Sequence, residues 1–220
     1  MSKDYIFAPE TLIKAYSLGV FPMAMAKDDP ELHFFEPDIR GVIPIMPPHI
    51  PRRLLRQVKQ ARYHIRYNTA FAKVIWHCAE VTPQRADSWI NDEIITLYIA
   101  LHKMGFAHSV EVWEDDALIG GLYGVKLGSV FFGESMFSRK SNASKIALAH
   151  LMARLHYGGF SLLDAQFPND HLTQFGLLEM PKDIFQTALQ AGLRQEADLA
   201  LALGEDVMID HLIQLNKDKS

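Results

Sequence analysis

The spacing of apolar residues changes several times along the chain, and each change predicts a different element. Pro9 opens an apolar-periodic stretch that continues to Leu18 and stops at Gly19, which predicts a short helix. The proline-containing segment that follows, from Phe21 to Pro51, predicts loops and short strands. The N-terminal part of the chain is therefore expected to hold one helix and little other regular structure.

Two helices with polar caps are predicted next. Asn68 stands where it could cap a helix that ends near Glu80, and Asn91 precedes a second apolar-periodic run from Asp92 to Met104. Gly105 follows this run directly, and glycine is the residue type most often found just after a helix. Both segments are therefore expected to be helical.

The period then changes to two, which is typical of strands. Alternation begins at Ser109 to Trp113, and turn residues separate it from two further apolar runs, Leu118 to Val125 and Ser129 to Phe132. Three strands joined by short turns predict an antiparallel meander. The rest of the chain predicts a long helix, a further strand and three shorter helices, at 142–157, 160–165, 170–175, 182–190 and 207–215 in that order.

Three antiparallel strands, a helix and another strand make up an α+β fold. We expect flanking helices on a sheet of antiparallel or mixed strands, an arrangement compatible with the acyltransferase fold of the N-acetyltransferase superfamily. Members of that superfamily that use acetyl-CoA carry a glycine-rich loop for its pyrophosphate before the helix, and residues 132–145 contain no such loop. An acetyl-CoA acyltransferase is therefore the weaker enzyme alternative.

Composition narrows the class of protein. A chain of 220 residues that is 49% hydrophobic can bury a substantial core without covalent cross-links. Cys78 is the single cysteine, so no internal disulfide can form. No apolar run approaches the roughly 18 residues of a membrane span, and the N-terminus lacks the pattern of a signal peptide. We therefore expect a soluble, cytoplasmic protein that makes no membrane contact.

Charge is distributed unevenly along the chain. The net charge is −4, yet the stretch between Asp38 and Glu80 holds eight basic residues and no acidic one. Within this stretch, apolar residues recur at helical spacing after Pro51, which predicts a basic amphipathic helix over 52–62. Such a surface suits the phosphates of an RNA, although a solvated helix face has the same pattern.

The stretch from Gly133 to Lys145, GESMFSRKSNASK, resembles the signature of the leucyl/phenylalanyl-tRNA-protein transferases. The resemblance implies a small N-terminal α/β domain, which we take as residues 1–50 with a boundary that could lie as far as residue 65. It also implies an acyltransferase-like catalytic domain, which we take as residues 51–220. Further family-like elements occur in order between about residues 12 and 192: LIKAYSLGVFPM, Trp89-Ile90, LHKMGFAHSVEVW, GGLYGV, Leu163-Asp164-Ala165-Gln166 and Asn169-Asp170-His171.

The resemblance also implies a function. In that family leucine or phenylalanine, with methionine as a further candidate, passes from aminoacyl-tRNA to the α-amino group of a protein that begins with Lys or Arg, which marks the protein for degradation in the N-degron pathway. We therefore expect an aminoacyltransferase that binds aminoacyl-tRNA and acceptor proteins, uses no cofactor or metal, and acts as a monomer. Two alternatives stay open: an acceptor that begins with Asp or Glu, as in a sister family, and a non-catalytic module that binds aminoacyl-tRNA.

The expected reaction is aminolysis of an activated ester, so the site has to orient an amine against a carbonyl group. The resemblance gives this task to Asp164, Gln166 and Glu134. Asp164 and Gln166 are two residues apart on a predicted strand and are expected to project to the same face. Gln166 would orient the amine or polarise the carbonyl, Asp164 would polarise Gln166 or accept a proton, and Glu134 would hold the amine or the ribose. A turn carboxylate at Asp164 and a surface charge at Glu134 are the plain structural alternatives.

The transferred side chain requires an apolar pocket whose shape excludes β-branched residues. Some relatives have aromatic residues at the positions of Leu151 and Leu155, so the preference between leucine and phenylalanine is left open. The resemblance implies a lining of six residues, for each of which a place in the plain hydrophobic core is the alternative: Leu122, Phe131, Leu148, Leu151, Leu155 and Leu163.

Contacts with the tRNA are implied at two places. Tyr16 and Tyr98 match aromatic positions that contact the terminal adenosine, and Met23 stands where many members have tryptophan. Methionine offers contact area without an aromatic face, which weakens stacking at that position. The tRNA phosphates are expected to contact the basic helix through four residues: Arg52, Arg56, Lys59 and Arg62.

Overall fold

The chain folds around a seven-stranded sheet. The structure is a computed structural model and describes residues 7–46, 48–60, 62–82, 87–199 and 202–217. Across the sheet the strand order is β4 (His64–Tyr67), β5 (Ala107–Glu114), β6 (Ala117–Leu127), β7 (Val130–Ser138), β8 (Leu162–Gln166), β3 (Ile39–Ile43) and β9 (Leu178–Pro181).

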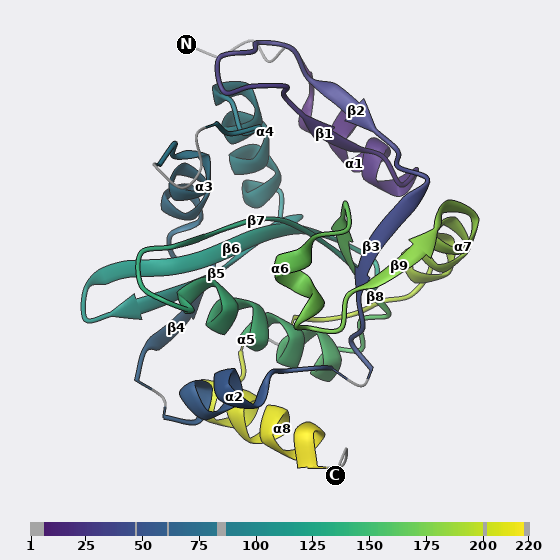
Figure 1. Cartoon of the computed structure of the whole chain (residues 1–220). Helices are drawn as coiled ribbons and strands as arrows, with labels where there is room; N and C mark the ends of the chain where they lie inside the picture. The colour runs from purple at the N-terminus through teal and green to yellow at the C-terminus, as the bar shows by residue number, and fades with distance from the viewer. Residues whose placement is uncertain (1–6, 47, 61, 83–86, 200–201, 218–220) are drawn as a thin grey trace.

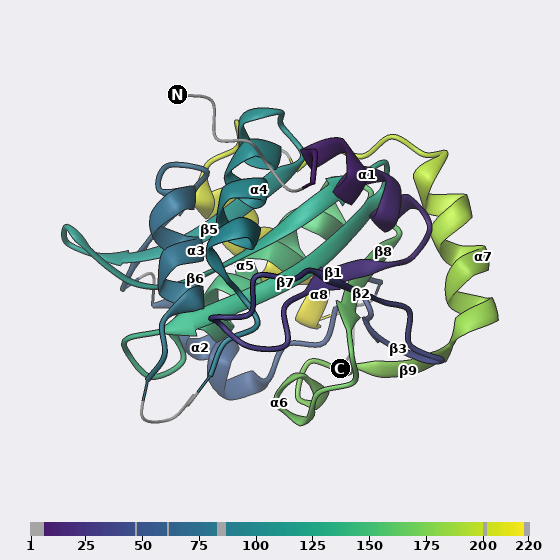
Figure 2. The same ribbon diagram turned by 90° about the horizontal axis from the view of Figure 1, so that it is seen from above.

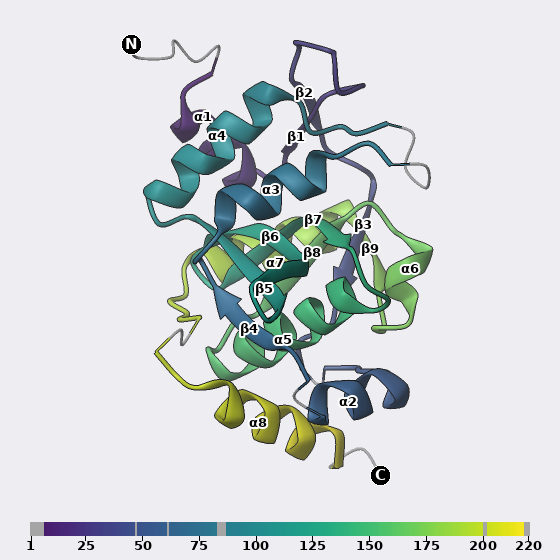
Figure 3. The same ribbon diagram turned by 90° about the vertical axis from the view of Figure 1, so that its left-hand side faces the viewer.

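Helices cover both faces of this sheet, as Figures 1 and 3 show. On one face lie α3 (Phe71–Ala79) and α4 (Asp92–Lys103), and on the other lies α5 (Ala143–Tyr157), with α2 (Arg52–Lys59) and α8 (Glu205–Lys217) packed outside it. Each face buries its own hydrophobic cluster against the strands. The α+β class predicted from the sequence is therefore confirmed.

The predicted meander is present, and its strands are longer than predicted. Strands β5, β6 and β7 pair antiparallel in sequence order. Strand β7 continues to Ser138 instead of stopping at Phe132, because it keeps pairing with β6 past a register shift between Tyr123 and Gly124. Strand β8 runs parallel to β7, which requires a long crossover, and α5 supplies it.

Two edge strands were not predicted. In β4 the side chains of His64 and Arg66 are exposed, and β9 has only four residues and ends in Pro181. Short, polar or proline-containing edge strands carry little periodicity, which is why the sequence did not indicate them. The segment predicted to hold short strands contributes β3, which pairs with β8 and β9, and a separate hairpin of β1 (Phe21–Met23) and β2 (His33–Phe35).

The helices lie close to the predicted positions. At the N-terminus α1 (Pro9–Ser17) lies over the sheet, and α7 (Lys182–Leu193) flanks the side formed by β3 and β9 (Figure 2). A short helix, α6 (Asp170–Thr173), follows β8. Helix α2 ends at Lys59, so Arg62 follows it instead of belonging to it. Residue 61, which the predicted helix included, lies outside the described residues.

The two predicted caps had different outcomes. Asn91 caps α4 as predicted, since its side chain accepts a hydrogen bond of 2.8 Å from the backbone N–H of Ile94. Asn68 does not cap α3, which begins only at Phe71, because Asn68 adopts a left-handed backbone with φ 59°. The buried Glu111 of β5 accepts instead from the backbone N–H of residue 70 at 2.8 Å. A distant strand therefore supplies the contact expected from a local cap.

Within the described residues, no helix combines the length and the apolar character that crossing a membrane requires.

Candidate functional site

Strands β7 and β8 pair over only three residues and then separate. Their parallel pairing covers residues 130–132 and 162–164. Two residues further along each strand, Glu134 and Gln166 both line a cavity of about 540 Å³. We call this the central cavity. Its walls come from both separated strands, from α5 and from the segment that leads into α6.

One wall of the central cavity is apolar. Leu122, Leu148, Leu151 and Leu163 line it, so the structure brings together four of the six residues proposed for an aminoacyl pocket. The other two, Phe131 and Leu155, are fully buried in the same hydrophobic cluster and are not on the cavity wall. Further apolar residues line the cavity that were not predicted from the sequence, among them Ile43, Met136 and Phe175.

The Asp164 side chain forms a buried ion pair. Its carboxylate is inaccessible to solvent and accepts from the guanidinium of Arg40 at two points, Nε to Oδ1 at 2.8 Å and Nη2 to Oδ2 at 2.6 Å. Oδ1 also accepts from the backbone N–H of Gln166 at 2.8 Å. The role predicted for Asp164 is to polarise Gln166 or to accept a proton. In the structure its contact with Gln166 is to the backbone.

Gln166 departs from the geometry of a regular strand. Its φ of 63° is left-handed, so the alternation that predicted a common face for Gln166 and Asp164 does not apply to it. The side-chain amide of Gln166 instead donates from Nε2 to Oε1 of Glu134 at 2.9 Å. The side chain that contacts the Gln166 amide group is therefore Glu134.

Glu134 accepts hydrogen bonds from three neutral donors. The hydroxyl of Tyr16 donates to Oε1 at 2.6 Å and that of Tyr98 donates to Oε2 at 3.1 Å, in addition to the bond from Gln166. The two tyrosine hydroxyls also contact each other. Residues from α1, α4, β7 and β8 thus meet in one polar cluster at the end of the central cavity.

The surroundings of Glu134 change its acidity. Burial raises the pKa of the Glu134 carboxyl to about 7, and the nearby Asp164 carboxylate acts in the same direction. The three hydrogen bonds oppose this rise because they stabilise the ionised form. Burial also raises the pKa of Tyr16 and Tyr98 well above the usual value, and the charge of Glu134 adds to this. At neutral pH both tyrosines are therefore donors, while Glu134 is balanced between its two protonation states.

The residues proposed for the terminal adenosine lie in different environments. Tyr16 and Tyr98 have no exposed surface, and their rings pack against Phe132 and Tyr123. An adenine ring could reach them only if they became exposed, so a stacking role for them stays a prediction. Met23, by contrast, is half-buried and lines the central cavity.

Trp89 and Arg40 belong to this site although no role was predicted for them. Trp89 lines the central cavity beside Met23, and it was visible in the sequence only as part of a family-like motif. Arg40 interrupts an otherwise apolar run, Ile39 to Ile43. A lone charge inside an apolar strand indicates a buried ion pair, and this was the available signal.

The basic helix has the predicted amphipathic character. Leu54 and Val58 are buried, while Arg52, Arg56 and Lys59 are exposed on α2. Arg62 is exposed after the end of the helix, where it lies 4.0 Å from Glu114. The four proposed phosphate contacts are therefore accessible and lie within a short stretch of chain. In the structure, α2 packs against α5 and α8.

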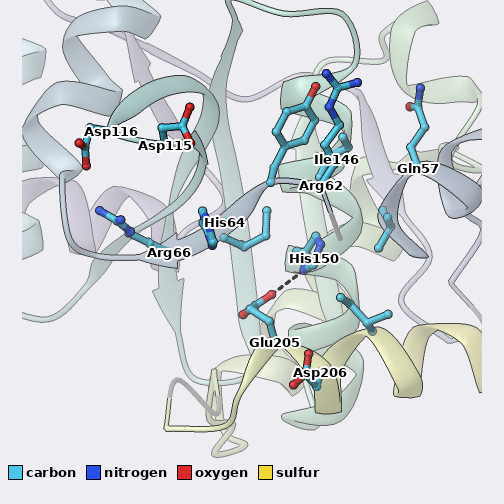
Figure 4. A pocket seen from close by; sticks show the side chains of 14 residues that line it. Gln57, Arg62, His64, Arg66, Asp115, Asp116, Ile146, His150, Glu205 and Asp206 are labelled. Carbon is cyan, nitrogen blue, oxygen red and sulfur yellow. Dashed lines mark ion pairs between the residues drawn. The ribbon is translucent and has the colours of Figure 1, made fainter. Parts of the chain in front are cut away.

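A second cavity, of about 670 Å³, shares no lining residue with the central cavity. It lies among α2, β4, α5 and the start of α8 (Figure 4). Its lining mixes Arg62 and Arg66 with acidic side chains, and Nδ1 of His150 lies 2.7 Å from Oε2 of Glu205 at its base. The two cavities therefore flank α5, which contributes His150 to one and Leu151 to the other.

Comparison with known proteins finds relatives that cover most of the chain. Residues 42–190 match the model of the leucyl/phenylalanyl-tRNA protein transferase family, and residues 6–38 match the model of its N-terminal domain. A leucyl/phenylalanyl-tRNA–protein transferase from Hyphomonas neptunium is 55% identical over 192 residues, which is 87% of this chain and 74% of that protein.

Two further relatives of the same name match more of their own length. The protein from Phenylobacterium zucineum is 50% identical over 198 residues, covering 90% of this chain and 89% of the relative. The protein from Nitrobacter winogradskyi is 48% identical over 213 residues, covering 96% and 95%. The resemblance inferred from the sequence motifs is confirmed. The chain belongs to the leucyl/phenylalanyl-tRNA protein transferase family.

Proposed function

We propose that this protein transfers leucine or phenylalanine from aminoacyl-tRNA to the N-terminal α-amino group of an acceptor protein. Its relatives are named leucyl/phenylalanyl-tRNA–protein transferases, which supports the proposal. One observation carries the proposal beyond the family name. The central cavity joins an apolar wall, which suits an unbranched hydrophobic side chain, to the Glu134–Gln166 cluster, which suits a reacting amine. An aminoacyl ester has the same two parts, an apolar side chain and a reacting polar group, and would lie across this junction.

The reaction needs orientation and one proton transfer. The acceptor nitrogen attacks the ester carbonyl carbon, a C–N bond forms, and the bond to the ribose oxygen breaks. The amine loses a proton and the leaving ribose oxygen gains one. A protein α-amine has a pKa of roughly 7.7 to 8, so a group of similar acidity can accept this proton and return it.

Glu134 fits the role of proton carrier. Its pKa of about 7 lies close to that of the amine, so transfer in either direction is nearly balanced. Its Oε2 accepts one hydrogen bond from within the protein, from Tyr98, which leaves a lone pair for the substrate. Gln166 would then orient the amine or the carbonyl. Asp164, which has no exposed surface, would hold Gln166 in place.

Shape would select the transferred residue. Leu122, Leu148, Leu151 and Leu163 form the apolar wall, and α5 is buried on nearly all its sides. A wall of this kind discriminates against β-branched chains by steric exclusion, at about 1–3 kcal/mol for each misplaced methylene. Methionine is unbranched and remains a further donor candidate.

The tRNA would contact the protein at two places. The exposed cations of α2 and Arg62 suit phosphates, because positive residues in an otherwise acidic chain attract an RNA backbone. Met23 and Trp89 are the accessible candidates for the terminal adenosine, since both line the central cavity. Tyr16 and Tyr98 would act through their hydroxyls on Glu134 unless the site opens.

Several expectations stay proposals. An acceptor that begins with Lys or Arg remains our first choice over one that begins with Asp or Glu, and the product would enter the N-degron pathway. We also retain the monomeric state, the division into residues 1–50 and 51–220, and the cytoplasm as the compartment where aminoacyl-tRNA is found. β3, within residues 1–50, pairs with β8 and β9, so the two parts would share one sheet.

A transfer assay tests the function directly. Purified protein is mixed with radiolabelled leucyl-, phenylalanyl- or valyl-tRNA and with model proteins that begin with Arg or Asp. We expect label from leucine and phenylalanine, and none from valine, on the Arg acceptor only. Label on the Asp acceptor alone would assign the sister specificity. Absence of label on both acceptors would leave a binding module.

The proton carrier predicts a pH dependence. Because Glu134 accepts a proton only when ionised, and its ionised fraction grows as pH rises through about 7, kcat of the wild type should fall as the pH drops below 7. Glu134→Gln should lower kcat about a hundredfold and remove the fall of kcat below pH 7. Glu179→Gln, which changes an exposed carboxylate on β9, is the control and should alter neither. If Glu134→Gln keeps the wild-type dependence of kcat on pH, a group other than Glu134 carries the proton.

The apolar wall predicts a change in donor preference. Leu151→Phe fills part of the central cavity and should lower kcat/KM for phenylalanyl-tRNA about tenfold more than for leucyl-tRNA. Leu155→Phe makes the same substitution away from the cavity wall and should leave the ratio of the two donors unchanged. Both donors are measured in one sample, so the ratio is independent of the folded fraction. If the ratio of kcat/KM for the two donors is the same in both variants, the aminoacyl side chain does not bind against Leu151.

The basic helix predicts a salt dependence. Replacing Arg52, Arg56 and Lys59 with Gln should raise KM for the aminoacyl-tRNA. It should also lower the slope of log KM against log salt concentration by about 2, since each phosphate contact contributes roughly 0.7–0.9 to that slope. A control that removes three exposed charges elsewhere replaces Lys14, Lys103 and Arg194 with Gln. If both triple variants change the slope equally, net charge and not the helix explains it.

A further inference from the structure

Arg40 is held on every side although it carries a full charge. It lies on β3 with 1% of its surface exposed. Besides the two bonds to Asp164, its Nη1 donates to the carbonyl oxygen of Gly19 at 2.9 Å. The rings of Phe21 and Phe185 lie 4.6 Å and 4.5 Å from its Cζ. The guanidinium is therefore fixed in both position and orientation.

This fixed cation determines the position of the Asp164 carboxylate. A planar guanidinium that donates from Nε and Nη2 to the two oxygens of one carboxylate defines both the distance and the plane of the pair, which a lysine ammonium cannot do. The pair has almost no exposed surface, so water cannot replace either partner. Arg40 accordingly holds the Asp164 carboxylate in one position beside the central cavity.

Asp164 in turn holds a strained backbone. A left-handed conformation is unfavourable for a residue other than glycine, and Gln166 adopts one with φ 63°. The bond from the Gln166 backbone N–H to Oδ1 of Asp164, at 2.8 Å, offsets this cost. In that conformation the Gln166 amide reaches Glu134. Three residues thus act in series, from Arg40 through Asp164 to Gln166.

We propose that Arg40 is a positioning residue for the transfer reaction. Through Asp164 it holds the left-handed backbone of Gln166, and this keeps the Gln166 amide beside Glu134 at the end of the central cavity. The inference deepens the proposed function and rests on it for the reaction that Arg40 serves. It also gives Asp164 the role of an anchor, because its carboxylate accepts three hydrogen bonds from inside the protein.

A purely structural role is the alternative, since Arg40 also joins β1 and α7 through the rings of Phe21 and Phe185. The chain offers a matched control in Arg154 on α5. Arg154 is also 1% exposed, its Nη2 donates to Oε1 of Glu205 at 2.7 Å, and its Cζ lies 3.9 Å from the Tyr67 ring centroid. Glu205 lines the second cavity (Figure 4), so this ion pair is separate from the Glu134–Gln166 cluster.

The test compares Arg40→Lys with Arg154→Lys in the full-length protein. Each substitution keeps the charge, removes the planar fork and should lower the melting temperature. Only Arg40→Lys should lower kcat, by about tenfold or more, because misplacing a reacting group is costly even when substrate still binds. KM for phenylalanyl-tRNA should change by less than about threefold in both. An equal loss of kcat in the two variants, or none in Arg40→Lys, would overturn the inference.

A second measurement does not depend on activity. The side-chain amide signal of Gln166 in ¹H–¹⁵N spectra is identified by its disappearance in Gln166→Leu. It should shift in Arg40→Lys and stay in place in Arg154→Lys. An unshifted signal in Arg40→Lys would refute the positioning role. If the wild type transfers no amino acid, the proposed function fails, while the spectra still decide whether Arg40 positions Gln166.

Discussion

A guanidinium and a carboxylate, both removed from water, lie where four segments of the chain meet. Arg40 comes from β3, Asp164 from β8, and the rings that enclose the guanidinium come from β1 and α7. A buried charge without its partner is strongly destabilising, so neither residue tolerates the absence of the other. The two are 124 positions apart in the sequence, and the position of β3 between β8 and β9 brings them together. The strand pairing of the sheet therefore also assembles this part of the site.

The two carboxylates of the site have opposite surroundings. Asp164 contacts a cation, whereas Glu134 contacts three neutral donors and lies close to the Asp164 charge. The same environment that makes ionisation of Glu134 unfavourable also makes its proton easy to exchange near neutral pH. Neighbouring groups of one chemical type can thus perform different tasks because their partners differ.

Local sequence pattern was informative wherever the structure depends on near neighbours. The meander, the α5 crossover and the Asn91 cap follow from periodicity and capping chemistry, and the apolar run at 160–165 predicted the strand that became β8. The pattern was uninformative where the partner is distant in sequence. Asn68 was read as a cap although Glu111 supplies that contact, and the ion pair made by Arg40 has no local signature beyond a charge in an apolar run. Edge strands β4 and β9 were too short to show a period.

The separation of β7 and β8 beyond residues 132 and 164 makes the central cavity a fork in a sheet. Sites built on loops take their dimensions from flexible chain, whereas here two strands of the sheet supply part of the wall. Across the fork the Gln166 amide donates to Glu134, so a side-chain hydrogen bond joins the two strands where their backbone pairing has ended.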